Sequence, residues 1–126
     1  MKKIIISTDQ APAAIGTYSQ AVNVDGTVYI SGQIPLDPIS MEIVSEDFTA
    51  QAVQVFANLI AVAEAAGGSL ADAVKLNVYL LDLDDFAALN QVMSEHMSEP
   101  FPARAAVQVS ALPRGAKIEI DAVLCL

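Results

Sequence analysis

The sequence predicts an α+β fold of two layers, in which two helices pack on one face of a mixed β-sheet. Three observations predict it. Stretches of alternating apolar residues, typical of strands, occur on both sides of two stretches with helical periodicity. No internal repeat or linker divides the chain. Apolar residues make up 54% of the 126 residues, enough for one core. The expected order is β-β-β-α-β-α-β-β, in a single domain over residues 1–126.

The first three strands are expected before residue 34. Residues 3–6 form a short apolar strand, and apolar positions alternate on both sides of Asp25-Gly26 at 22–24 and 28–30. This pattern predicts a hairpin with a tight turn. Two prolines in the segment 34–38 would remove hydrogen-bond donors from a central strand, so a loop should directly follow Ser31-Gly32-Gln33.

Two helices are expected around a central strand. The first should begin near Asp47, with Ser45 or Asp47 as its N-cap, and end at Gly67-Gly68. The second should span residues 84–97, after a half-buried strand over 74–80. The apolar faces expected to point inward are Ala52, Phe56, Leu59, Ile60 and Ala63 on the first helix, and Phe86, Leu89, Met93 and Met97 on the second.

The last two strands are expected over 103–109 and 117–124, joined around Pro113-Arg114-Gly115 and paired antiparallel. Arg104 would then lie opposite Val123, on the order of 13 Å from Glu119 in one chain. Alternation should turn Val107, Val109, Ile118, Ile120 and Leu124 toward the helices, and Arg104, Ala106, Gln108, Lys117, Glu119 and Asp121 away from them. A helix-free face that mixes apolar and charged residues suits a subunit interface as well as a solvated surface.

Composition excludes several functions. A net charge of −9 would repel a phosphate backbone or an anionic membrane, so no nucleic-acid or membrane partner is expected. A single cysteine, Cys125, cannot form an internal disulfide, and one histidine with one cysteine cannot build a His/Cys zinc site. The N-terminus lacks a signal-peptide apolar stretch. These features predict a cytoplasmic protein without a metal or cofactor.

Other polar residues have structural explanations. Asp82, Asp84 and Asp85 lack the later residues of a calcium loop and should cap the second helix. His96, near the end of that helix, is expected to be structural or exposed, and Cys125 to be a small buried apolar residue. Arg104 follows a stretch stiffened by proline, and its guanidinium suits two-point binding of a carboxylate. From spacing alone, a surface ion pair is the favoured explanation.

Five motifs in order and spacing then carry a resemblance to the reactive-intermediate deaminase (RidA/YjgF) family: Ala11-Pro12-Ala13-Ala14-Ile15-Gly16, Ser31-Gly32-Gln33-Ile34-Pro35, Ala65-Ala66-Gly67, Asp82-Leu83-Asp84-Asp85-Phe86 and Phe101-Pro102-Ala103-Arg104. The resemblance covers essentially the whole chain. It implies a chorismate-mutase-like fold, a homotrimer with ligand clefts between subunits, and hydrolysis of small 2-enamino and 2-imino acids (2-aminoacrylate/2-iminopropanoate, 2-iminobutanoate) to 2-oxo acids and ammonium.

The resemblance also implies roles for single residues. It places the carboxylate-binding arginine at Arg104 and the glutamate that acts on water at Glu119. The implied substrate-binding residues are Tyr18, Ser31, Gly32, Asn90, Arg104 and Ala106; many members have cysteine in place of Ala106 and proline in place of Thr17. Because an imine carbon is already electrophilic, the reaction needs no metal or cofactor. Two other functions stay open, a regulatory module that binds 2-oxo acids without turnover and an RNA-directed nuclease or translation inhibitor.

Overall fold

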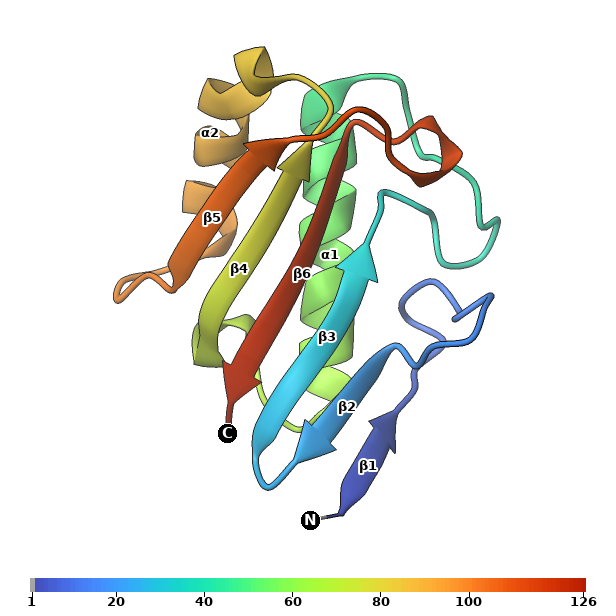
Figure 1. Ribbon diagram of the computed structural model, residues 1–126, viewed down its shortest axis with the longest axis vertical. Coiled ribbons are helices and arrows are strands. Elements are labelled where there is room, and N and C mark those ends of the chain that lie inside the picture. The colour runs from blue at the N-terminus through green and yellow to red at the C-terminus, as the bar shows by residue number, and fades with distance from the viewer. Residues whose placement is uncertain (1) are drawn as a thin grey trace.

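A six-stranded sheet with two α-helices on one face forms the computed structural model, which describes residues 2–126 (Figure 1). The strands lie in the order β1-β2-β3-β6-β4-β5. Their bounds are β1 Lys3–Ile6, β2 Ala21–Val24, β3 Thr27–Gln33, β4 Ala73–Leu80, β5 Ala103–Gln108 and β6 Ile118–Cys125; the helices are α1 Phe48–Ala65 and α2 Phe86–His96. Only β4 and β5 pair in parallel. The predicted fold class and element order are confirmed.

The predicted hairpin joins β2 and β3. Asp25 and Gly26 both have left-handed backbone angles, φ 52° and 90°, as a two-residue hairpin turn of the favoured twist requires. Further along β3, the pairing with β6 passes from Ile30–Ala122 to Gln33–Ile120. One extra residue is therefore accommodated on β3, and a β-bulge forms at Ser31-Gly32.

Helix α1 begins and ends as predicted. The Asp47 side chain caps it by accepting a hydrogen bond from the Ala50 amide at 2.9 Å, and Gly67 follows it with φ 91°. Its predicted apolar face lies on the sheet, with Ile60 partly buried. By length and a mean hydropathy of 1.3, α1 could cross a membrane, but half of it is buried inside the fold, as in the core helix of a globular domain.

Helix α2 is preceded by a short 3₁₀ turn, η2 (Leu83–Asp85), which Asp82 caps by accepting from the Asp84 amide at 2.8 Å. Leu89, Met93 and Met97 are buried as expected. The His96 ring stacks on Phe56 with centroids 5.4 Å apart, so this histidine is structural. Cys125, in contrast, is exposed at the end of β6, and the prediction of a buried cysteine is wrong.

The predicted pairing of the last two strands is wrong. β5 pairs only with β4, so that Arg104 lies opposite Leu76, and β6 is inserted between β3 and β4 (Figure 1). The connection is too long for a tight hairpin. It crosses the end of β4 through bonds from the Val109 amide to the Leu80 carbonyl and from the Leu81 amide to the Lys117 carbonyl, and it contains the 3₁₀ turn η3 (Pro113–Gly115).

The predicted facing of β5 is also wrong. Arg104 belongs to a cross-strand row with Ile30, Ala122 and Leu76, all three of which are buried beneath the helices. Directly opposite residues point to the same face of a sheet, so Arg104 points to the helix side. By the same register, Ala106 and Gln108 point to the helix side, and Val107, 48% exposed, shares the helix-free face with Glu119. β5 is an edge strand, and its helix side meets α2. There, polar residues such as Arg104 lie on the helix side, where apolar residues are expected, so the apolar–polar alternation of β5 predicts the wrong facing.

Candidate active site

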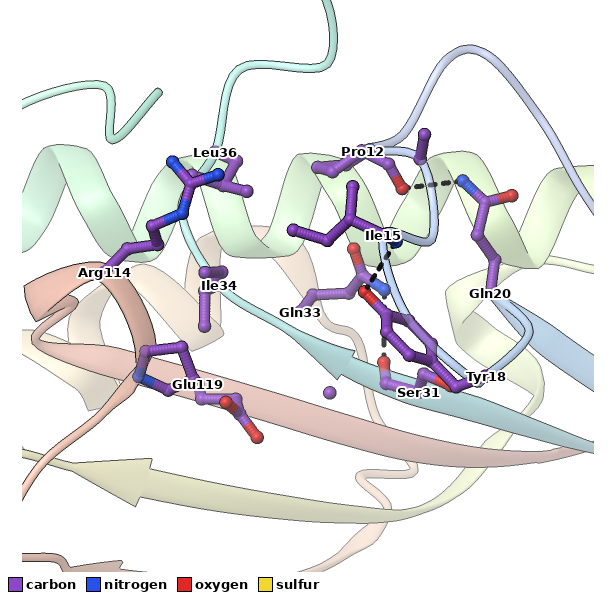
Figure 2. Close-up of a pocket in the computed structure, with 13 residues that line it drawn as sticks. Pro12, Ile15, Tyr18, Gln20, Ser31, Gln33, Ile34, Leu36, Arg114 and Glu119 are labelled. Atoms are coloured by element: carbon purple, nitrogen blue, oxygen red, sulfur yellow. Dashed lines mark hydrogen bonds between the residues drawn. The ribbon is translucent and has the colours of Figure 1, made fainter. Parts of the chain in front are cut away.

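One cavity of about 520 Å³ opens beside Glu119, at the end of β3 and the start of β6. We call it the Glu119 cavity. Figure 2 shows Glu119 and Arg114 at one end of it and Tyr18 and Ser31 at the other. Its lining is Pro12, Ala13, Ile15, Tyr18, Gln20, Ser31, Gly32, Gln33, Ile34, Leu36, Pro113, Arg114 and Glu119. Four of the predicted site residues, Tyr18, Ser31, Gly32 and Glu119, therefore share one cavity.

Glu119 is half-buried on the helix-free face of β6. Burial, and secondarily the negative charge of Asp121, raise the pKa of Glu119 above its usual value. Asp121 is itself fixed, because its carboxylate accepts hydrogen bonds from Asn77 Nδ2 at 2.8 Å and Tyr79 Oη at 3.0 Å. A raised pKa makes a carboxylate a stronger base, which suits a group that takes a proton and returns it.

The bulge in β3 makes room for the Glu119 carboxyl group. An added Cβ at Gly32 would collide with the Glu119 carboxylate, so the glycine is what lets this carboxylate occupy its present position. Gly32 also lines the cavity, so its predicted role in substrate binding stays a prediction. Ser31 is fixed beside it, since its amide donates to the Gln20 carbonyl at 2.9 Å and its Oγ donates to the Ser19 carbonyl at 2.5 Å.

The segment before β2 forms the wall opposite Glu119. Its anchor is Gln20, which is buried and whose Nε2 donates to the Pro12 carbonyl at 2.8 Å (Figure 2). The same Nε2 donates to the Thr8 carbonyl at 3.0 Å. Tyr18 is 52% exposed, and its hydroxyl accepts a hydrogen bond from the Ile15 amide at 3.4 Å. Tyr18 therefore lies at the open edge of the cavity, where a ligand or a neighbouring subunit can reach it.

Arg104 and Asn90 lie in a second hollow of about 330 Å³ between α2 and β5, which we call the Arg104 depression. It is lined by Asn90, Met93, Ser94, Phe101, Pro102 and Arg104. Arg104 Nη1 donates to Asn90 Oδ1 at 2.7 Å, and its Cζ lies 5.1 Å from the centre of the Phe86 ring. These contacts orient the guanidinium while using Nη1 alone, so Nε and Nη2 stay available for a two-point contact with a carboxylate.

The two hollows are separate within one chain. Glu119 lies opposite Tyr79, which lies opposite Val107, three residues beyond Arg104 on β5. Two strand spacings and three residues put the Arg104 and Glu119 Cα atoms about 14 Å apart, on opposite faces of the sheet. One small ligand cannot contact both side chains of the same chain. Ala106 packs against the core and lines neither hollow.

Sequence reasoning missed several residues of the Glu119 cavity. Arg114 was predicted only as part of a turn, but it lines the cavity. The chain has only six basic residues, so each of them is a candidate for binding an anion, and this signal could have indicated Arg114. Ile15, Ile34 and Leu36 add an apolar wall from loops that carry no periodic pattern. Among residues 2–126, no group of three or more His, Cys, Asp or Glu side chains is placed to hold a metal ion.

Comparisons with known proteins test the family resemblance. The sequence model of a family described as Endoribonuclease L-PSP matches residues 8–125. Protein DfrA of Myxococcus xanthus is 52% identical over 98% of this chain and 95% of its own length. The 2-iminobutanoate/2-iminopropanoate deaminase of Capra hircus is 49% identical over 94% of this chain and 87% of its own length. The crystal structure of RidA from the Antarctic bacterium Psychrobacter has a TM-score of 0.95 and 61% identity, covering 98% of this chain and 99% of that one. With matches of this extent in sequence and structure, the chain belongs to the RidA (Endoribonuclease L-PSP) family.

Proposed function

We propose that this protein is a cytoplasmic hydrolytic deaminase of small 2-enamino and 2-imino acids, active as a homotrimer whose sites lie between subunits. The observation that carries the proposal is the division of the expected site residues between two hollows on opposite faces of one sheet. Each hollow supplies one of the two groups that the reaction needs. The Glu119 cavity has a carboxyl group suited to moving protons, and the Arg104 depression has an oriented guanidinium suited to a carboxylate.

A cyclic trimer can join the two halves. In a head-to-tail interface, one surface of each subunit meets a different surface of the next. The Arg104 depression lies on edge strand β5, where a neighbour can approach, and the helix-free face exposes Ile5, Tyr29 and Val107 at 48–53%. Large apolar residues on a face that no helix covers are typical of an interface. We therefore expect Arg104 of one subunit to complete the Glu119 cavity of its neighbour.

The chemistry then follows from the two groups. Arg104 holds the substrate carboxylate, which fixes the imine carbon relative to Glu119. The imine reacts in its nitrogen-protonated form: Glu119 takes a proton from water as the water oxygen bonds to the imine carbon and the C=N electron pair moves to nitrogen, which gives a neutral carbinolamine. Glu119 returns this proton to the amino nitrogen, the C–N bond breaks to release ammonia, and the hydroxyl proton passes to the ammonia, which leaves a 2-oxo acid and ammonium. An enamine such as 2-aminoacrylate must first be protonated on carbon to give the imine.

The test is a coupled assay. A threonine dehydratase supplies the four-carbon enamine, and release of 2-oxobutanoate and ammonium is followed with and without this protein. We expect faster release with the wild-type chain and little acceleration with Glu119→Gln, which keeps the shape of the side chain but cannot exchange the proton. Asp72→Asn, a charge change in the 3₁₀ turn η1 (Leu70–Asp72) outside both hollows, is the matched control.

The assay separates the proposal from its rivals. Binding of 2-oxobutanoate without faster release would identify a regulatory module instead of an enzyme. For a nuclease, the same purified protein would have to cleave RNA. The net charge of −9 argues against an RNA partner, because an electronegative surface weakens contact with phosphates.

A further inference from the structure

We propose that Arg114 is a second anion-binding residue of the Glu119 cavity and that it favours ligands with a distal carboxylate, the 2-imino and 2-oxo derivatives of dicarboxylic amino acids. The inference rests on the proposed function, because it takes the other carboxylate of the ligand to be held by Arg104 of a neighbouring subunit.

The position of Arg114 supports this role. It lies in η3, and its backbone is left-handed at φ 59° and ψ 17°, which is uncommon for a residue other than glycine. Gly115 follows with φ 69°, so the chain reverses sharply at this point. The turn brings the Arg114 side chain to the cavity, on the side of Ile34 and Leu36 and away from Tyr18 and Ser31 (Figure 2).

The guanidinium of Arg114 is available to a ligand. Its Nη1 donates to the Met41 carbonyl at 3.2 Å, and no carboxylate of residues 2–126 forms an ion pair with it, although the chain has 15 acidic residues. The carbonyl fixes the side chain without neutralising its charge, and Nε and Nη2 remain free to donate. In the lining of the cavity, Glu119 supplies a carboxylate and Arg114 supplies a guanidinium, so Arg114 is the group that can attract an anion.

The shape of the cavity fits a longer ligand. The cavity extends from Glu119 past the apolar side chains of Ile34 and Leu36, which lie on the side of Arg114 (Figure 2). A ligand whose reacting carbon is next to Glu119 would extend its methylene groups along this apolar wall. A carboxylate at the end of such a chain would meet the guanidinium, whereas a methyl group there would leave the charge unpaired.

The test compares two stable 2-oxo acids with five carbons, 2-oxoglutarate and 2-oxopentanoate, which differ by the distal carboxylate. Calorimetry gives both affinities for the wild-type trimer, for Arg114→Gln and for the control Lys117→Gln. Lys117 also carries a positive charge, lies three residues away and does not line the cavity. We expect the wild type to bind 2-oxoglutarate more tightly, and Arg114→Gln to reduce its preference over 2-oxopentanoate about five- to tenfold. This is less than a buried charged contact would give, because Arg114 is exposed. Lys117→Gln should leave the preference unchanged.

Equal weakening of both ligands by Arg114→Gln would overturn the inference, because it would mean that Arg114 only supports the loop at Met41. An unchanged preference would overturn it as well. Melting temperatures of the variants show whether each is folded. The outcome is independent of turnover: if 2-iminobutanoate is hydrolysed but the preference does not depend on Arg114, the proposed function stands and this inference fails. If no imine is hydrolysed but the preference for 2-oxoglutarate depends on Arg114, the proposed function fails and the anion-binding role of Arg114 stands.

Discussion

Mixing two inactive variants tests whether the active site is shared between subunits. Arg104→Ala removes the group proposed to hold the substrate carboxylate, and Glu119→Ala removes the group proposed to act on water. In one chain these residues lie on opposite faces of the sheet, about 14 Å apart by strand spacing and register. Neither variant alone should hydrolyse 2-iminobutanoate. A mixed trimer, however, contains an intact site wherever an Arg104→Ala chain supplies Glu119 to a neighbour that supplies Arg104.

The expected recovery follows from the symmetry. In a cyclic trimer each site uses one Arg104 and one Glu119 from adjacent subunits, so every mixed trimer has one intact site, whichever variant is in excess. Random mixing of equal amounts gives about a quarter of the wild-type number of sites. The two chains are unfolded together and refolded, native mass spectrometry counts the mixed trimers, and the coupled assay measures turnover. Recovery that depends on mixing and approaches a quarter supports the shared site.

Verified mixed trimers with no more activity than the parent variants would refute the reasoning. Such a result would mean that Arg104 and Glu119 of the same chain serve the same site, which requires a rearrangement of β5, or that one of them has no part in the reaction. Mixing wild type with each single variant is the control, since activity there should fall in proportion to the wild-type sites lost.

Three further predictions concern single residues. Arg104→Lys should fold and assemble but lose about 10- to 100-fold in kcat/KM, because an ammonium cannot replace the planar fork that Asn90 and Phe86 orient; unchanged kcat/KM would contradict the carboxylate contact. Gly32→Ala should change the melting temperature little, because the group it displaces is the flexible end of Glu119, yet reduce kcat on the order of 10- to 100-fold; unaltered kcat would mean that the carboxylate position is unimportant. Asp121→Asn should lower the pKa of Glu119 by removing the nearby charge, so the acidic limb of the pH–rate profile, where activity rises as Glu119 loses its proton, should move to lower pH. The pKa of Glu119 should stay above the usual glutamate range in this variant, because burial is the larger cause of the raised pKa. An acidic limb that does not move would show that Glu119 is not the titrating group.

Local sequence signals were enough for most elements. Asp47 and Gly67 define α1 because a cap and a left-handed residue act within one turn of the helix, and Asp25-Gly26 defines the hairpin for the same reason. The inward faces of both helices follow from their 3.6-residue periodicity. The family resemblance also implies that Tyr18, Ser31, Gly32 and Glu119 are site residues, and these four line one cavity.

Only the tertiary structure decided how the last strands are arranged. The β5 sequence Ala-Arg-Ala-Ala-Val-Gln has no strict apolar alternation and fits either face, and the sequence cannot tell whether β5 joins β6 or β4 because both pairings satisfy its backbone. The insertion of β6 between β3 and β4 turns Arg104 to the helix side and separates it from Glu119. The sequence by itself predicted which residues could carry the chemistry, since side-chain type limits what each group can do. The structure decided that one chain holds those groups in two hollows, because strand order and register depend on contacts between segments far apart in the sequence.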